Sequence, residues 1–495
     1  MLSGADGVAM MGYPRKMRRT RIVATLGPAT DRPGMLARIL DAGVNVVRLN
    51  MSHGTHDDHA RRISEVRTLA GPIEVAILAD LQGPKIRVGL LPQGGVILTE
   101  GDKFVLTNRD VISGPGIATL DYPPLPSEVS VGASILLDDG NLELHVDATD
   151  RSDISCTVVR GGRLTSHKGI NVPGAPLSAP ALTDKDLGDA VFAAGLGVDF
   201  LALSFVRRAA DIVELRDHLI RRGFAPDACG IIAKIERPEA LEVISEILAE
   251  ADGIMVARGD LGVEIPLERV PQAQKRLLDQ CNQAAKPAIT ATQMLESMIN
   301  QARPTRAEAT DVHVAVTELT DAVMLSGETA AGKFPLEAVQ AMAAIAHAAE
   351  QVVTDADHSL NARRDKARTA TEAVAQAVVE IAMELGAHAI VTATSSGGTP
   401  RLVAKYRPKA PILALSSHLG VLRRLLLTWG VTPVLAPPFS STDELFRHAV
   451  QATVELGIAK DGDLIVITAG VPLGVTGRTN LIKVHRIGEP LPGSH

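Results

Sequence analysis

The chain has 495 residues, of which 46% are hydrophobic but only 2% aromatic, and its formal net charge is −7. This length exceeds that of one ordinary domain, and the aliphatic content is large enough to fill several hydrophobic cores. The modest charge, the lack of a long basic block and the scarcity of aromatic residues exclude the usual nucleic-acid-binding surfaces, so we expect no nucleic acid partner.

The sequence gives equally little reason to expect a membrane or an oxidising compartment. No apolar run approaches the roughly 20 residues that span a bilayer. Residues 1–19 lack the apolar core of a secretory signal and predict a flexible N-terminal extension. Cys156, Cys229 and Cys281 are far apart and form no metal-binding spacing, so we interpret them as buried or unused thiols in a reducing cytoplasm.

Eight short aliphatic runs alternate with helix-like segments over the first two-thirds of the chain. Their near-continuous content of Val, Ile and Leu is typical of parallel strands that are covered on both faces. Eight strand–helix units predict an α/β fold, a closed (β/α)8 TIM barrel formed by residues 20–86 and 174–352. The runs are RIVATLG, VNVVRLN, VAILADL, DFLALSF, GIIAKIE, GIMVARG, PAITATQ and AVMLSGE.

Two further domains are predicted from changes in this pattern. Residues 87–173 alternate apolar residues with turn signals such as DDGN, which predicts short antiparallel strands in a small inserted β-barrel domain. Residues 353–370 are polar and have the profile of a linker or an exposed helix. Five more apolar runs then alternate with helical stretches, so residues 353–495 are expected to form a C-terminal open α/β domain.

Polar side chains concentrate at the carboxyl ends of the predicted barrel strands, where barrel enzymes form their active sites. Residues two apart on a strand share a face, so these side chains should converge. A ring of buried charges needs counter-ions, a metal or a charged ligand; a purely structural ion-pair network is the alternative. The residues are Arg48, Asn50, Asp80, Lys234, Glu236, Arg258, Asp260, Thr292, Ser326 and Glu328.

Three of these residues indicate phosphoryl transfer. Glu236 and Asp260 offer hard oxygen ligands on neighbouring strand ends, which suit Mg²⁺ or Mn²⁺. Lys234 lies on the same strand end as Glu236. A lysine with a divalent ion supplies the positioning and charge neutralisation that phosphoryl transfer needs. The segment GETAAGKF also resembles a P-loop, but Phe334 replaces the Mg²⁺-binding hydroxyl, so we interpret this match as accidental.

Longer motifs resemble a known family. KIERPEA, GIMVARGDLGVEIP, TATQMLESM, RPTRAEATDV and MLSGETAAGKFPLEAV follow one another, with NVVRLNMSHGTH and KGINVPG upstream. In order and spacing they resemble the pyruvate kinases, from about residue 20 to the C-terminus. The resemblance implies a glycolytic enzyme that transfers the phosphoryl group of phosphoenolpyruvate to ADP, with pyruvate and ATP as products. It also implies a homotetramer.

The resemblance implies roles for the residues at the strand ends. Lys234 matches the lysine beside the transferred phosphoryl group, and Glu236 and Asp260 match the divalent-metal ligands. Thr292, with the backbone amides of Gly259 and Asp260, matches the cradle for the substrate carboxylate. A glycine there lets the chain approach an anion closely.

The same resemblance places a nucleotide and a monovalent cation on the other side of the cleft. Arg48 and Arg87 match residues that contact phosphate. Lys168 lies close to the return from the insert, which is consistent with a lid that closes over ADP and excludes water. The implied nucleotide-binding residues are Asn50, His53, Arg87 and Lys168. The implied monovalent-cation site, or its substitute, consists of Asn50, Ser52, Asp80 and Lys85.

Two roles stay open between chemistry and structure. The resemblance implies that Thr292 and Ser326, with water, deliver the proton to the enolate, but either hydroxyl could equally be bonded to the backbone at a strand end. Arg258 could serve only to hold the barrel rim.

The segment after the third run departs from the common family pattern. Many pyruvate kinases read DTKGPE there, and the threonine and glutamate belong to their K⁺ requirement, whereas residues 80–85 here read DLQGPK. The ammonium of Lys85 is a fixed monovalent cation, so we predict the lysine-bearing, potassium-independent branch and no requirement for K⁺. The alternative is a merely solvated lysine.

A turn in the C-terminal domain resembles the family's effector loop. It consists of Thr394, Ser395, Ser396, Gly397, Gly398 and Thr399, and it is rich in donors for a phosphate. Gly398 replaces a basic residue of some members, and AGVPLGVTGRTN lacks the tryptophan of those that bind fructose bisphosphate. We therefore expect an allosteric effector that is a sugar monophosphate or AMP.

Two other functions remain alternatives. Barrel lyases and aldolases also use carboxylates and Mg²⁺ to stabilise a pyruvate enolate, but they need no nucleotide lid. A metabolite sensor on an inactive barrel is a non-enzymatic reading, which Lys234, Glu236 and Asp260 argue against.

Overall fold

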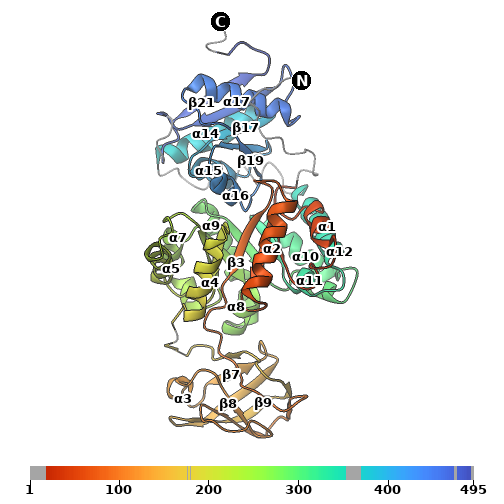
Figure 1. Cartoon of the computed structure of the whole chain (residues 1–495), viewed down its shortest axis with the longest axis vertical. Helices are drawn as coiled ribbons and strands as arrows, with labels where there is room; N and C mark the ends of the chain where they lie inside the picture. The colour runs from red at the N-terminus through yellow and green to blue at the C-terminus, as the bar shows by residue number, and fades with distance from the viewer. Residues whose placement is uncertain (1–17, 176, 179, 353–368, 473–476, 492–495) are drawn as a thin grey trace.

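The chain folds into three blocks that follow one another along its long axis (Figure 1). The barrel lies in the middle, with the inserted β domain at one end and the C-terminal domain at the other. The computed structural model describes residues 18–175, 177–178, 180–352, 369–472 and 477–491. Almost all of the predicted extension 1–19 and of the predicted linker 353–370 lies outside the described residues.

The central block is a closed barrel of parallel strands in the order β1-β16-β15-β14-β13-β12-β3-β2. Each of the eight aliphatic runs supplies one strand, so the predicted TIM-type fold is confirmed. The strands are β1 (Arg21–Thr25), β2 (Val46–Asn50), β3 (Ala76–Asp80), β12 (Phe200–Leu203), β13 (Gly230–Ile235), β14 (Gly253–Ala257), β15 (Ala288–Ala291) and β16 (Ala322–Leu325).

Helices cover the outside of the barrel, and several begin at a reciprocal cap. Thr55, Thr183 and Thr305 each accept a hydrogen bond from the amide three residues on, whose acidic side chain bonds back to the cap. The barrel helices are α1 (Met35–Asp41), α2 (His56–Leu69), α4 (Asp184–Gly195), α5 (Ala209–Arg221), α6 (Pro238–Glu242), α7 (Ile244–Glu250), α8 (Arg258–Glu264), η1 (Leu267–Arg269), α9 (Val270–Gln283), η2 (Glu296–Ile299), α10 (Arg306–Thr317), α11 (Gly327–Ala330) and α12 (Pro335–Glu350).

The insert leaves the barrel after β3 and returns before α4. Its strands form a six-stranded sheet, β11-β7-β8-β9-β5-β6, and a two-stranded pair, β10-β4, around one apolar core. The sequence predicts a small β-barrel, and the segment 86–89 joins the two edges of this sheet: the Ile170 amide at β11 donates to the Ile86 carbonyl at 2.8 Å, and the Gly89 amide donates to the Thr119 carbonyl of β6 at 2.7 Å. The elements are β4 (Val96–Leu98), β5 (Lys103–Thr107), β6 (Ile117–Thr119), α3 (Leu125–Glu128), β7 (Ser134–Leu137), β8 (Leu142–Thr149), β9 (Asp153–Arg160), β10 (Gly162–Leu164) and β11 (Ile170–Asn171).

The C-terminal domain is the predicted open α/β domain. Its sheet has the order β19-β18-β17-β20-β21, and all pairs are parallel except β20 with β21. One apolar core packs the sheet against α17, and a second packs its other face against α14, α15 and α16. The elements are α14 (Ala370–Glu384), β17 (Ala389–Ala393), α15 (Gly398–Lys405), β18 (Ile412–Ser416), α16 (Leu419–Leu425), β19 (Val431–Leu435), α17 (Thr442–Glu455), β20 (Leu464–Ala469) and β21 (Leu481–Arg486).

The C-terminal domain closes one end of the barrel. Leu426 and Leu427, just after α16, belong to the apolar cluster that fills the barrel interior. Asp321, at the start of β16, accepts hydrogen bonds from Arg407 and from the amide of Trp429, both at 3.1 Å. This packing occupies the amino ends of the strands, so their carboxyl ends, from which the insert departs, form the other end of the barrel.

The described residues contain no helix that is long and apolar enough to cross a membrane. Cys156, Cys229 and Cys281 are buried free thiols, as predicted. Burial raises the pKa of Cys156 and of Cys229 to about 12, so both stay protonated near neutral pH and are poor nucleophiles.

Candidate active site

Asp80 lies at the centre of a charged cluster at the barrel mouth. Its carboxylate accepts a hydrogen bond from Arg48 Nε at 2.6 Å and lies 3.3 Å from Lys234 Nζ. Lys234 also contacts Glu236 at 2.9 Å and donates to the hydroxyl of Ser204 at 2.7 Å. The strand ends of β2, β3, β12 and β13 therefore bring two cations and two carboxylates together.

Burial and pairing fix the charges of this cluster. Burial alone would raise the pKa of Asp80, but Lys234 and Arg48 outweigh it, and the pKa lies below its ordinary value. Burial disfavours the ammonium of Lys234, yet Asp80 and Glu236 hold its pKa above the ordinary lysine value. Because the pKa of Asp80 is lowered and that of Lys234 is raised, both groups stay charged throughout the neutral range.

Glu236 and Asp260 form an acidic pair that suits a divalent cation. Burial raises the pKa of Glu236; Lys234 opposes this rise and the charge of Asp260 adds to it. Two carboxylates that disfavour each other's charge are stabilised by a cation with hard-oxygen preference. Among the described residues, no group of three or more His, Cys, Asp or Glu side chains could hold a metal, so water and substrate would supply the other ligands of an ion held here.

Gly259 and Thr292 meet where β14 and β15 end. The Gly259 amide donates to Thr292 Oγ1 at 2.8 Å, and that hydroxyl donates to the Ala291 carbonyl at 2.6 Å. Thr292 has a φ of 66°, which is uncommon for a β-branched residue and places its side chain over the glycine. The amides at the start of α8 and this hydroxyl thus form one polar surface.

Arg258 holds the backbone next to this polar surface. Its guanidinium donates to the Thr292 carbonyl at 2.8 Å and pairs with Asp311 at 2.6 Å. These bonds join α8, α10 and the end of β15. They favour the rim-holding role for Arg258.

The loop after β2 carries Asn50, Ser52 and His53. The Asn50 side chain accepts from the Ser52 amide at 3.1 Å, and the His53 amide donates to the Asn50 carbonyl at 3.2 Å. The Met51 amide donates to the backbone carbonyl of Asp80 at 2.9 Å, which ties the loop to the charged cluster.

Three basic residues lie along the insert. Lys85 Nζ is 3.4 Å from Asp260 and 3.3 Å from Asp139 of the turn between β7 and β8. Lys168 pairs with the neighbouring Asp138 at 2.6 Å, and Arg87 donates to the His167 carbonyl at 2.9 Å. Lys85 therefore joins the barrel cluster, whereas Arg87 and Lys168 make these contacts within the insert.

Burial disfavours the charge of Lys85, but Asp260 and Asp139 outweigh it and raise its pKa above the ordinary lysine value. The side chain is 24% exposed, so this ammonium is a largely enclosed, permanent cation rather than a fully solvated one.

Comparison with known proteins identifies the family. The family model "Pyruvate kinase, barrel domain" matches residues 17–339, and "Pyruvate kinase, alpha/beta domain" matches residues 372–485. The chain belongs to the pyruvate kinase family. The pyruvate kinase of Geobacillus stearothermophilus is 50% identical over 480 residues, which are 96% of this chain and 81% of the relative. Pyruvate kinase 2 of Synechocystis sp. is 48% identical over 474 residues, which are 94% of this chain and 79% of the relative.

Two polar residues of this candidate site are missing from the set predicted from the sequence. Ser204 accepts from Lys234 and donates to the Leu81 carbonyl at 2.7 Å. Thr25 accepts from Arg48 at 3.0 Å. Thr25 lies near the end of the first aliphatic run and Ser204 near the end of the fourth, and neither strand end contributes a charged residue to the site. A search of every strand end for hydroxyls would have found both.

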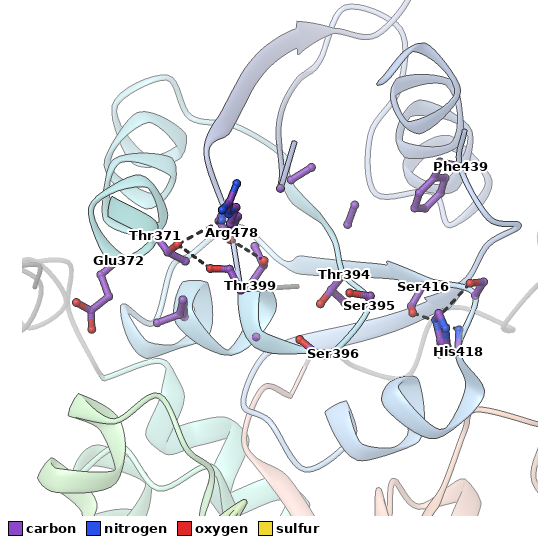
Figure 2. A pocket seen from close by; sticks show the side chains of 18 of the residues that line it. Thr371, Glu372, Thr394, Ser395, Ser396, Thr399, Ser416, His418, Phe439 and Arg478 are labelled. Carbon is purple, nitrogen blue, oxygen red and sulfur yellow. Dashed lines mark hydrogen bonds between the residues drawn. The ribbon is translucent and has the colours of Figure 1, made fainter. Parts of the chain in front are cut away.

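The turn 394–399, predicted to be an effector loop, lines a cavity of about 510 Å³ in the C-terminal domain, away from the barrel mouth. Figure 2 shows Thr399 and Arg478 on one side of the cavity and Ser416 with His418 on the other. Gly397, with a φ of 83°, precedes α15, and its amide donates to Thr394 Oγ1 at 2.8 Å. The lining includes Thr394, Ser395, Ser396, Gly398 and Thr399.

Proposed function

We propose that the chain catalyses the pyruvate kinase reaction of glycolysis. The phosphoryl group of phosphoenolpyruvate moves to a terminal oxygen of ADP, and the enolate that remains takes a proton at its terminal carbon to give pyruvate. The observation that carries this proposal is the contact of Lys234 with both Asp80 and Glu236 at the mouth of the barrel.

In this proposal each group of the cluster acts on charge or position. Lys234 neutralises the migrating phosphoryl group, and Arg48 contacts its oxygens. Glu236 and Asp260 would hold Mg²⁺ or Mn²⁺, which supplies further neutralisation when bound. The amides of Gly259 and Asp260, with Thr292, hold the substrate carboxylate.

The proton donor is proposed from the same geometry. The Thr292 hydroxyl donates to a backbone carbonyl, which favours a structural role for it in this state. We therefore assign the proton path to Ser326 with water, and Thr292 to the carboxylate cradle. Lys168, Arg87, Asn50 and His53 are proposed to hold the nucleotide beneath the insert.

A coupled assay tests this function. With phosphoenolpyruvate, ADP and Mg²⁺, lactate dehydrogenase should report pyruvate formation that depends on ADP and stops when EDTA removes the metal, because the charge on the phosphoryl group is then uncompensated. Pyruvate formation without a nucleotide would favour a lyase or aldolase. A folded protein that forms no pyruvate would favour the metabolite sensor.

We also propose that K⁺ is not required. Lys85 supports this, since its ammonium lies beside Asp260 where other members carry a glutamate. A homotetramer in the cytoplasm is proposed from the family resemblance, and the boundaries 20–86, 87–173, 174–352 and 353–495 stay predictions.

The effector is proposed to be a phosphomonoester, either a sugar monophosphate or AMP. Hydroxyls, the amino end of α15 and Arg478 offer donors for one phosphate, and the cavity is large enough for a sugar or nucleoside. Saturating AMP, ribose 5-phosphate or glucose 6-phosphate should shift the phosphoenolpyruvate concentration at half-maximal rate by about fivefold or more. A response to fructose 1,6-bisphosphate alone would contradict this proposal.

A further inference from the structure

The loop of residues 51–55 has little structure of its own. It lies between β2 and α2, and its internal bonds run only from Ser52 and His53 back to Asn50. The Met51 amide bonds to the Asp80 carbonyl and Thr55 bonds to Asp58, so the ends of the loop are tied while its middle needs outside support to keep a fixed geometry.

Two side chains outside the loop hold its carbonyls. Lys185 Nζ, from α4, donates to the Met51 carbonyl at 2.7 Å across 134 residues of sequence. His59 Nε2, from α2, lies 3.0 Å from the His53 carbonyl. Burial and nearby Arg62 lower the pKa of His59, so its ring is neutral, and a carbonyl only accepts, so Nε2 carries the hydrogen.

Lys185 is itself held in place. It pairs with Asp189 at 2.5 Å, one turn along α4, and the other oxygen of that carboxylate lies 2.7 Å from His56 Nε2. The ring of His56 stacks on Phe192 with centroids 3.9 Å apart and planes 4° apart. The Asp189 side chain is only 6% exposed, whereas the side chains of Lys185 and His56 are half-exposed, so the buried carboxylate anchors both of them.

We propose that Lys185 is a positioning residue for the nucleotide side of the site, held by Asp189 and His56. This inference rests on the proposed function, in which Asn50 and His53 belong to that side. The Met51 carbonyl belongs to the peptide bond between Met51 and Ser52, so a charged donor on it fixes the path of the chain from Met51 towards Ser52 and His53. Release of that carbonyl lets the peptide rotate and misplaces the ligands of ADP.

The test compares two substitutions of one residue. Lys185→Met should weaken the binding of Mg·ADP by about tenfold in isothermal titration calorimetry, the scale of one lost hydrogen bond from a charged donor. The KM for phosphoenolpyruvate should change by less than about twofold, since the substrate cradle is on α8 and β15. Lys185→Arg retains a charged donor and should restore most of the ADP affinity. Hydrogen exchange of the amides in 51–55 should be faster in Lys185→Met only.

The control is Lys275→Met. Lys275 pairs with Asp279 one turn along α9, so this variant also removes a lysine–aspartate pair on a barrel helix, but one without a loop carbonyl. It should leave ADP affinity unchanged.

Unchanged ADP affinity and unchanged exchange in Lys185→Met would overturn the inference, as would equal losses in KM for both substrates. If the wild type binds ADP but forms no pyruvate, the proposed function fails while the binding comparison still decides the role of Lys185. A wild type that binds no ADP overturns both.

Discussion

Replacing Lys234 by methionine is expected to lower kcat by about a hundredfold or more, the scale of losing one group that stabilises transition-state charge. Its ammonium lies 2.9 Å from Glu236 and 3.3 Å from Asp80. Methionine has a similar length and no branch, so the substitution removes the charge while filling most of the same space. The measurement is the lactate dehydrogenase-coupled rate at saturating phosphoenolpyruvate, ADP and Mg²⁺.

Loss of stability must be separated from loss of chemistry in this variant. Removing one partner of a buried ion pair costs about 3–5 kcal/mol when the other charge stays unpaired. Arg48 still pairs with Asp80, so Glu236 bears the cost, and Lys234→Met/Glu236→Gln should recover the thermal midpoint without recovering kcat.

Lys286→Met is the matched control. Lys286 is a half-buried lysine that donates to the carbonyls of Leu248, Ala249 and Ala251, where α7 ends. Its loss should lower the thermal midpoint and leave kcat of the folded enzyme near the wild-type value. A near-normal kcat for Lys234→Met would refute the proposed role of Lys234.

Most of the barrel could be predicted from the sequence, because each strand is marked by a short run of neighbouring residues. A run such as VAILADL shows both a strand covered on two faces and its polar end at Asp80. The i, i+2 spacing of Lys234 and Glu236 likewise predicts that both point to one side, and the two side chains are in contact.

The features that could not be predicted depend on contacts between residues that are far apart in the sequence. The Lys185 contact with the Met51 carbonyl spans 134 residues, and no motif marks it. No motif distinguishes Leu426 and Leu427 either, yet they belong to the apolar cluster inside the barrel. The closure of the insert is similar, since apolar alternation predicts strands but not that the segment 86–89 bonds to both edges of the sheet.

The ion pairs around the mouth join three carboxylates to three cations. Asp80, Glu236 and Asp260 face Arg48, Lys234 and Lys85, so Lys85 supplies the third cation. A substitution of Lys85 therefore alters the net charge of the cluster without changing the strand that carries Lys234.

Lys85→Glu is therefore expected to make the enzyme depend on K⁺. The variant places a third carboxylate beside Asp260 and Asp139, and at such distances each unit charge is worth about 1–4 kcal/mol between bulk water and a protein surface. The rate without K⁺ should fall by about a hundredfold, and about 100 mM KCl should restore a large part of it, because K⁺ replaces the lost ammonium. The wild-type rate should be the same in tetramethylammonium and in K⁺ buffers.

Lys103→Glu controls for charge reversal in the insert, since Lys103 pairs with Asp147 at 2.9 Å but is 75% exposed and contacts no residue of the cluster. Its rate should be insensitive to K⁺. A wild type that is inactive without K⁺ would show that Lys85 does not substitute for the ion. If K⁺ fails to rescue Lys85→Glu, the ammonium is needed for its pairing with Asp260. A cation free in the cleft would then not serve the reaction, whereas one held at that carboxylate would.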